Sequence, residues 1–324
     1  MDNILELRNI KKYFSIKNNT LFGGKSIFLK AVDDINLTIG RGEIVGLVGE
    51  SGCGKTTLGR TAVRLYQPTA GSIIFNNQDI TNFTYEQLIP IKKQMQIIFQ
   101  DPYASLNPRF TVGDIISEPM DIHNLYSNKA ERMEKVQELL QVVGLKPDHV
   151  RRYPHEFSGG QRQRIGIARA LAVNPQLIMC DEPISALDVS IQAQIINMLE
   201  HLQEERNLSY LFIAHDLSMV RHISHRIGVM YLGNLVEIGK CSTVYHHPLH
   251  PYTKALLSAV PIPDPDQAKK QQRQLLTGEI PSPLTPPVGC PFVTRCASLL
   301  SCCSEIKPQM KEVDGRQVAC HLYD

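Results

Sequence analysis

Residues 49–57 read Gly-Glu-Ser-Gly-Cys-Gly-Lys-Thr-Thr and directly follow the apolar run Ile-Val-Gly-Leu-Val at residues 44–48. This order of strand, glycine-rich loop and helix is what a phosphate-binding loop requires, because glycines let consecutive backbone N–H groups turn toward one point. Lys55 adds a cation for the β- and γ-phosphates, and Thr56 offers a hydroxyl to Mg²⁺. The stretch predicts that a nucleoside triphosphate is bound by Gly49, Glu50, Ser51, Gly52, Cys53, Gly54, Lys55, Thr56 and Thr57.

Composition limits the classes of protein that remain. The chain has 324 residues, 43% of them apolar, which suffices for one large core and a second, smaller unit. Its formal net charge of +2 gives no basic surplus, so nucleic acid is not expected as a partner. No apolar run approaches the roughly 20 residues that cross a bilayer, and the first ten residues lack the apolar block of a signal peptide. We therefore expect a protein that is kept in the cytosol.

Short apolar runs alternate with helical patterns, which predicts an α/β fold with a mostly parallel core sheet. The predicted buried strands are residues 44–48, 73–75, 96–99, 177–180 and 210–214, and the clearest helix is 189–204. Two other stretches, 3–14 and 27–39, are typical of a separate antiparallel β subdomain. Gly233-Asn234 has the chemistry of a tight hairpin turn.

The middle and the end of the chain depart from this alternation. Strand signals vanish between 101 and 165, where residues 129–143 carry apolar side chains at helical spacing, so a helical subdomain is expected. Residues 261–274 are polar and rich in proline, which is the composition of a linker. We expect one large domain over residues 1–260, followed over residues 261–324 by the linker and a small cysteine-rich extension.

Polar side chains follow three of the predicted strands. Asp181 and Glu182 come after 177–180, Gln100 closes 96–99, and His215 closes 210–214. In phosphoryl transfer Asp181 would hold Mg²⁺ through water, and Glu182 would be the general base that polarises the attacking water. Taken alone, such an acidic pair is more often a solvated cap or a salt-bridge partner, and the amide and imidazole could be ordinary polar residues at a sheet edge.

A second anion site is predicted where a serine and two glycines open a helical pattern. These residues are Ser158, Gly159, Gly160 and Gln161. Backbone N–H groups and the helix dipole at such a start attract negative charge. One chain then carries two half-sites for phosphate.

Together these motifs resemble those of ABC ATPases and occur in that family's order over residues 1 to about 260. They correspond to Walker A (49–57), the Q-loop (Gln100), the signature (158–161), the Walker B end (Asp181, Glu182), the D-loop (185–188) and the switch histidine (His215). The resemblance implies a head-to-tail dimer with a second ABC ATPase subunit, in which signature and D-loop residues of one subunit close over ATP held by the other.

The same resemblance implies roles for individual residues. Those implied in catalysis are Glu182, His215 and Gln100; those implied in Mg²⁺ binding are Thr56, Gln100 and Asp181. Nucleotide contacts are implied for the P-loop residues 49–57, for 158–161 and for Asp188 of the D-loop. Adenine would stack on Tyr13 or Phe14, and the alternation of a strand does not decide which.

Three further stretches resemble the dipeptide and oligopeptide importer subfamily, most of all the second, F-type, of its two ATPase subunits. They are residues 100–108, 247–257 and 278–283. The likeness implies ATP hydrolysis that energises peptide import. One alternative is an importer for another substrate such as nickel, whose ATPases commonly lack the cysteine-rich extension. The other is a soluble non-transport ABC ATPase, which usually has two nucleotide domains or a long coiled coil. An exporter subunit would end soon after the hairpin.

The subfamily also implies partners and a location. Two permease membrane subunits would bind the ATPase pair, and an extracytoplasmic peptide-binding protein would be an indirect partner. The chain would then lie peripherally on the cytoplasmic face of the cell (inner) membrane. Substrate selection resides in the permease and the binding protein, so this sequence does not name the substrate, nor whether the ATPase pair is a homodimer or a heterodimer.

Cysteines crowd the end of the chain. Five of the eight lie between residues 290 and 320, and in a reducing compartment such a group suggests a metal before disulfides. Four thiolates brought together suit a [4Fe–4S] cluster or tetrahedral zinc. The subfamily's spacing selects Cys290, Cys296, Cys303 and Cys320, with Cys303 preferred to its neighbour, and similar importer subunits carry an iron–sulfur cluster at these positions.

Overall fold

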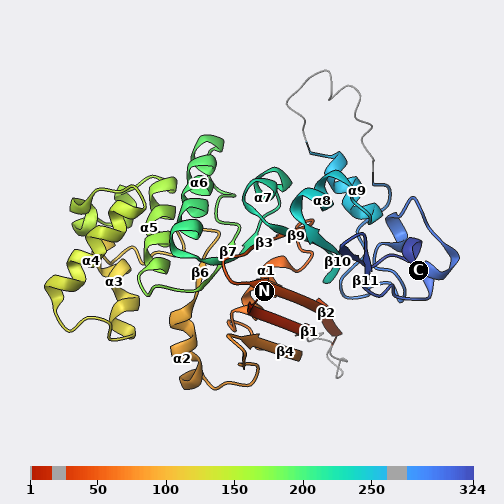
Figure 1. Ribbon diagram of the computed structural model, residues 1–324, viewed down its shortest axis with the longest axis horizontal. Helices are drawn as coiled ribbons and strands as arrows, with labels where there is room; N and C mark the ends of the chain where they lie inside the picture. Colours follow the sequence, from red (N-terminus) through yellow and green to blue (C-terminus); the bar gives the residue numbers. More distant parts are fainter. Residues whose placement is uncertain (1, 17–26, 261–275) are drawn as a thin grey trace, which may run out of the picture. The chain divides into compact units, whose positions relative to one another are not determined.

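A computed structural model describes residues 2–16, 27–260 and 276–324 (Figure 1). The chain forms two compact units, each assembled from separate stretches of sequence. Unit 1 takes in residues 1–4, 39–43 and 82–213, and unit 2 takes in residues 5–38, 44–81 and 214–324. The predicted linker at 261–274 lies outside the described residues.

Unit 1 contains three parallel strands in the order β8-β7-β6, which confirms three of the predicted strands. They are β6 (Met95–Ile98), β7 (Leu177–Asp181) and β8 (Ser209–Ile213). Every residue of β7 and β8 is buried, which is why their sequences are continuous apolar runs rather than alternating ones. The predicted helix at 189–204 is α6 (Val189–Arg206), and α2 (Tyr85–Gln94) precedes β6.

The helical part of unit 1 lies between β6 and β7. All of residues 101–165 are described, and they form helices and turns with no strand, as their sequence predicts. The helices are α3 (Val112–Ile122), α4 (Lys129–Val142) and α5 (Gly159–Leu171), with short 3₁₀ turns at Pro147–Arg151 and Pro154–Glu156. Figure 1 shows these three helices side by side. Their apolar faces meet in a core that includes Ile116, Val136 and Leu140, all fully buried.

Most of the four-stranded sheet, with the order β2-β1-β4-β5, belongs to unit 2. Its strands are β1 (Asn3–Ile16), β2 (Ile27–Gly40), β4 (Ala70–Phe75) and β5 (Gln78–Asp79). The sequence placed residues 73–75 in the parallel core sheet, and this was wrong. β4 pairs antiparallel with β1, Leu5 opposite Phe75, because a short buried run carries no signal for the direction of its neighbour.

The second sheet of unit 2 has the order β11-β12-β10-β9-β3. β3 (Ile44–Val48) runs parallel to β9 (Arg226–Tyr231), and β10 (Asn234–Lys240) returns antiparallel. Two strands that the sequence did not predict, β11 (Lys311–Val313) and β12 (Arg316–Val318), extend this sheet because β12 pairs with β10. The helices of unit 2 are α1 (Lys55–Ala62), α7 (Leu217–Ile223), α8 (Cys241–His246) and α9 (Pro251–Ser258).

The hairpin between β9 and β10 turns one residue earlier than Gly233-Asn234. Asn234 lies opposite Tyr231, so the two turn residues are Leu232 and Gly233, with φ of 43° and 74°. A two-residue turn of this kind needs positive φ at both positions. Asn234 instead begins β10, where its side-chain amide donates to the carbonyl of Leu232 at 2.7 Å.

Among the helices in the described ranges, none combines the length and the mean hydropathy that crossing a bilayer requires.

Candidate functional site

The P-loop, residues 49–57, connects β3 to α1 in unit 2. Gly49 and Gly54 have φ of 149° and 105°, and a Cβ at either position would lie 2.2 Å from a backbone oxygen, that of Met230 and that of Ala31 respectively. Gly52 also has positive φ, at 75°, but a Cβ there would meet nothing within 4 Å. Gly49 and Gly54 are thus required because the loop packs closely against β9 and β2. Gly52 instead leaves open space in front of the loop.

Lys55 begins α1 and is only 4% exposed. Its ammonium donates to the carbonyls of Gly49 at 2.8 Å and Glu50 at 3.0 Å. The side chain of Lys55 therefore spans the P-loop, and its charge lies at the loop's first residues. The Cys53 thiol lies 3.7 Å from the same nitrogen. Burial raises the pKa of Cys53, which keeps it a neutral thiol inside the loop.

Glu50 is held by side chains that the sequence did not single out. Its backbone N–H donates to the hydroxyl of Tyr252 at 3.0 Å. Its carboxylate accepts two hydrogen bonds from the Arg295 guanidinium, at 2.9 and 3.1 Å, and Arg295 also reaches the Tyr231 hydroxyl at 3.4 Å. Tyr252 lies in the stretch 247–257 that carries the family resemblance, but no local pattern points to Arg295.

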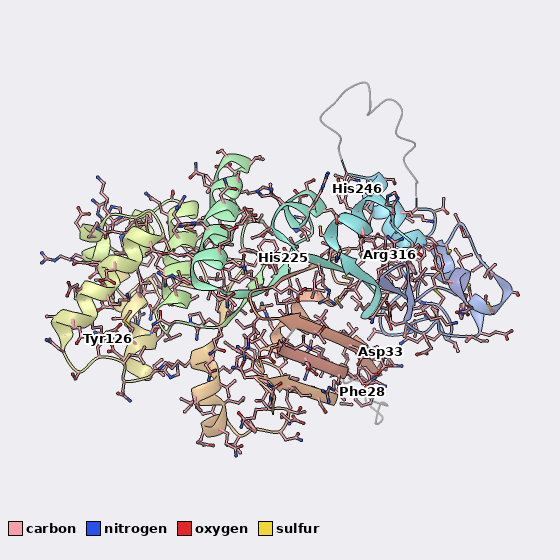
Figure 2. The ribbon with its side chains drawn as sticks, in the orientation of Figure 1. Phe28, Asp33, Tyr126, His225, His246 and Arg316 are labelled. Atoms are coloured by element: carbon pink, nitrogen blue, oxygen red, sulfur yellow. The ribbon has the colours of Figure 1, made fainter. Side chains whose placement is uncertain are left out.

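The two aromatic candidates for adenine stacking, Tyr13 and Phe14, are both half-buried on β1. The Tyr13 hydroxyl donates to Asp33 of β2, which is labelled in Figure 2. Burial and then this hydrogen bond raise the pKa of Tyr13. Phe14 meets Tyr66 edge to face, with ring centroids 5.7 Å apart, and the Lys12 ammonium lies 4.9 Å from its centroid.

In unit 1 the structure brings Gln100 and Glu182 together. Ile98 pairs with Cys180 across the parallel strands, so the residues that follow β6 and β7 lie at one edge. There the Gln100 amide donates to the Glu182 carboxylate at 2.8 Å. Glu182 has φ of 47°, a left-handed conformation that non-glycine residues seldom adopt. The preceding Asp181 is fully buried at the end of β7.

The residues 158–161 begin α5, as predicted. Ser158 is the N-cap: its hydroxyl accepts from the Gln161 N–H at 3.4 Å, and the Gln161 side chain accepts from the Ser158 N–H at 3.1 Å. A Cβ at Gly160 would lie 2.5 Å from a methyl of Ile191, so this glycine lets α5 approach α6. Ser158 and Gly159 are exposed. Asp188, also exposed, is the N-cap residue of α6.

Two predicted site residues of unit 2 complete the set. Thr56 lies in the first turn of α1, half-buried, and His215 is exposed in the segment between β8 and α7. The predicted residues therefore divide between the units. Unit 2 holds Tyr13, Phe14, the P-loop and His215, and unit 1 holds Gln100, residues 158–161, Asp181, Glu182 and Asp188.

All eight cysteines are described, and each carries a free thiol. Burial raises the pKa of Cys290 to about 11, and it also raises those of Cys296 and Cys320; a charge on Cys303 adds to the rise in all three. The backbone two residues after each of these cysteines lowers its pKa and so opposes the rise. The Cys290 N–H donates to the Cys303 carbonyl at 2.8 Å.

The pKa of each of these three cysteines is thus raised in part by charge on Cys303, as expected of thiols in one neighbourhood, which suits a thiolate-bound metal. They are not arranged as a preformed site. Within the part of the chain that the structure describes, there is no group of three or more His, Cys, Asp or Glu side chains placed to hold a metal ion.

Comparison with known proteins identifies two regions of the chain. Residues 32–185 match the family model described as ABC transporter, and residues 236–303 match the model described as oligopeptide/dipeptide transporter, C-terminal region. The oligopeptide transport ATP-binding protein AppF of Bacillus subtilis is 57% identical over 324 residues, covering 99% of this chain and 98% of that protein. The oligopeptide transport ATP-binding protein OppF of Escherichia coli is 49% identical over 327 residues, covering 99% and 96%.

Among solved structures, the chain resembles the dimeric structure of a post-hydrolysis state of the ATP-binding cassette MJ0796 bound to ADP and Pi. The TM-score is 0.64 at 29% sequence identity, covering 73% of this chain and 98% of that one. The predicted α/β class with a cassette of mixed sheets and helices is confirmed by this likeness.

Proposed function

The chain belongs to the ABC transporter family, among the ATP-binding proteins of oligopeptide transport, and we propose that it hydrolyses ATP to energise the import of dipeptides or oligopeptides. The observation that carries the substrate class is the match of residues 236–303 to the C-terminal region of such transporters, because this region lies outside the P-loop and the other ATPase motifs. In this proposal residues 1–260 are the ATPase domain, with 101–165 as its helical subdomain, and residues 261–324 are the linker and extension.

Binding of ATP would depend on the P-loop. Its N–H groups and Lys55 would surround the β- and γ-phosphates, while Thr56, Gln100 and Asp181 would hold Mg²⁺ directly or through water. Adenine would stack on Tyr13 or Phe14, the two half-buried aromatics of β1. The open space in front of Gly52, where a Cβ would meet nothing within 4 Å, supports this placement of the phosphates.

Hydrolysis would depend on the residues after the strands. Glu182 is the proposed base that polarises the attacking water, and Gln100, which donates to it at 2.8 Å, would orient that carboxylate. His215 would stabilise the charge that develops on the γ-phosphate. Phosphoryl transfer asks the protein mainly for such positioning and charge stabilisation.

The proposed working state is a head-to-tail dimer with a second ABC ATPase subunit. In it Ser158, Gly159, Gly160 and Gln161 would face the ATP held by the partner's P-loop, with Asp188 nearby. The exposure of Ser158, Gly159 and Asp188 in this chain leaves them available to a partner. The pair would dock peripherally on two permease subunits at the cytoplasmic face of the membrane, and an extracytoplasmic peptide-binding protein would deliver substrate.

A test of peptide import uses a strain from which the gene is deleted. Uptake of a labelled tripeptide should fall to background, the wild-type gene should restore it, and the Lys55→Ala gene should not. Uptake of Ni²⁺ measured in the same strains is the control. Loss of Ni²⁺ uptake with intact peptide uptake would favour the nickel alternative, and no transport defect would favour a soluble ATPase.

For the extension we propose a [4Fe–4S] cluster held by Cys290, Cys296, Cys303 and Cys320, with zinc as the alternative. The backbone hydrogen bond from Cys290 to Cys303, at 2.8 Å, and the effect of Cys303 on the pKa values of the other three thiols support it. When bound, the cluster would cross-link a segment with short secondary elements and little core of its own. Because the thiols are not preformed as a site, metal binding and local ordering would be coupled.

The matched pair Cys296→Ser and Cys302→Ser tests this ligand set, since both cysteines are half-buried in the same segment. In protein prepared without oxygen, Cys296→Ser should lose the brown colour and most of the iron, whereas Cys302→Ser should keep both. Iron and acid-labile sulfide are measured per chain. A colourless wild type with stoichiometric zinc would establish the zinc alternative instead.

A further inference from the structure

The C-terminal tail, residues 276–324, contacts the proposed nucleotide site within unit 2. Arg295 reaches the P-loop residue Glu50 across 245 positions of sequence, and Lys307 reaches Asp33 across 274. Neither residue belongs to a motif of the ATPase core. Both contacts come from the cysteine-bearing part of the chain, since Arg295 precedes Cys296 directly.

The Arg295–Glu50 pair is two-pronged and shielded from water. Two guanidinium nitrogens donate to the two carboxylate oxygens at 2.9 and 3.1 Å, and the side chains are only 8% and 24% exposed. Removing one partner of such a pair leaves the other charge desolvated and uncompensated, which is costly.

Hydrogen bonds therefore hold all three polar groups of Glu50. Its carboxylate is held by Arg295, its N–H by Tyr252, and its carbonyl by Lys55. It follows Gly49 directly, so its backbone sets the direction of the first N–H groups of the loop. A residue fixed in this way determines the shape of the P-loop, although its own side chain points into the tail.

The tail also packs against the loop with apolar groups. Ile280 and Pro283 line a cavity of about 180 Å³ whose other walls are Glu50, Ser51, Gly52, Cys53, Tyr231 and Leu232. Phe292 lies 5.2 Å from Tyr231 and 5.4 Å from Tyr252, measured between ring centroids. These are the two tyrosines that contact Arg295 and Glu50.

A second contact of the tail lies beside Tyr13, one of the two candidates for adenine stacking. The Lys307 ammonium lies 2.9 Å from the Asp33 carboxylate that accepts from the Tyr13 hydroxyl. This ion pair is more exposed than the first, at 36% and 19%. Exposed pairs contribute little to stability, so Arg295 is the dominant contact.

We propose that Arg295 is a positioning residue for ATP binding: the tail holds the P-loop in its nucleotide-binding conformation through the Arg295–Glu50 pair. The inference rests on the proposed nucleotide site. It makes the tail part of the ATP-binding apparatus of this chain. Loss of the pair weakens the binding of Mg²⁺–ATP without removing any group that touches phosphate.

The test measures the Kd of Mg²⁺–ATP by calorimetry for the full chain and its variants. Arg295→Gln should weaken binding about 10-fold, and Arg295→Lys, which keeps the charge and loses the fork, about threefold. Glu50→Gln should weaken binding similarly to Arg295→Gln. The double variant should be no more than about twofold weaker than the worse single variant, because both changes break one interaction.

Arg316→Gln is the matched control. Arg316 is labelled in Figure 2. Arg316 is also a buried tail arginine, 5% exposed, but it donates to the Thr243 carbonyl at 3.0 Å rather than to the P-loop. It should lower the melting temperature and leave the Kd within about twofold of wild type. If Arg295→Gln fails to fold, Arg295→Lys and Glu50→Gln carry the test.

Lys55→Ala separates the two possible failures. If Lys55→Ala weakens binding while Arg295→Gln and Glu50→Gln bind as wild type does, the inference is overturned and the nucleotide site stands. If Lys55→Ala also binds as wild type does, the proposed nucleotide site itself is wrong. An equal loss of affinity in Arg295→Gln and Arg316→Gln would show a general effect of tail stability and would also overturn the inference.

Discussion

Units 1 and 2 support their candidate functional groups in different ways. In unit 2 the P-loop residue Glu50 is held by buried side chains, Tyr252 and Arg295, that lie 202 and 245 positions away in sequence. In unit 1 the hydrogen bond between Gln100 and Glu182 is exposed, just after the carboxyl ends of β6 and β7. Groups held by buried contacts move only at a high cost in free energy, whereas exposed hydrogen bonds exchange readily with water. The proposed phosphate cradle is therefore preorganised, and the proposed hydrolytic pair can change partners during a catalytic cycle.

The largest expected effect concerns the exposed pair. Glu182→Gln should slow ATP hydrolysis by about 10²- to 10⁴-fold, because it removes the base but keeps the size of the side chain and a hydrogen bond to Gln100. The Kd of Mg²⁺–ATP should stay within about twofold of wild type, because Glu182 is not among the proposed phosphate ligands. Single-turnover hydrolysis and calorimetry measure the two quantities. Turnover at the wild-type rate would remove the role assigned to Glu182.

The next largest effect tests whether the signature residues 158–161 act on a partner's ATP rather than on ATP bound by the same chain. Ser158→Arg should weaken ATP-driven dimerisation about 100-fold, since a bulky cation replaces an exposed cap that the proposed dimer places next to the partner's nucleotide. ATP binding by the isolated chain should be retained. Analytical ultracentrifugation with Mg²⁺–ATP follows the dimer, in the Glu182→Gln background to prevent turnover. Equal loss of ATP binding in the monomer would contradict a role in trans.

A smaller effect addresses the preorganised cradle. Lys55→Ala should weaken Mg²⁺–ATP binding about 10- to 100-fold, because it removes the proposed direct charged contact to phosphate and frees the carbonyls of Gly49 and Glu50. The comparison with Glu182→Gln is the control, since only the lysine variant should change affinity. If both variants lost affinity equally, binding and hydrolysis would not be divided between Lys55 and Glu182.

The smallest effect contrasts two glycines of α5. A Cβ at Gly166 would meet nothing within 4 Å, so Gly166→Ala should raise the free energy of unfolding by about 0.5–1 kcal/mol through helix propensity. A Cβ at Gly160 would lie 2.5 Å from a methyl of Ile191, so Gly160→Ala should lower it. Urea denaturation of the two variants measures both signs. Destabilisation by Gly166→Ala would mean that unit 1 packs more tightly around α5.

Local features of this protein were readable from sequence because their causes are local. The P-loop, the helix α4, the buried runs β6, β7 and β8 and the cap at Ser158 each depend on residues within a few positions of one another. The order of these motifs along the chain led to the ABC ATPases, and the family match bears this out.

Features that depend on neighbours distant in sequence were decided only by the tertiary structure. The antiparallel pairing of β4 with β1, the addition of β12 to β10 and the turn at Leu232-Gly233 follow from which strands meet. The contacts of Arg295 with Glu50 and of Lys307 with Asp33 span more than two hundred residues, and no periodicity or spacing records them. Sequence thus determined which chemical groups this chain carries, while folding decided which of them touch, because a contact between distant segments depends on the packing of everything between them.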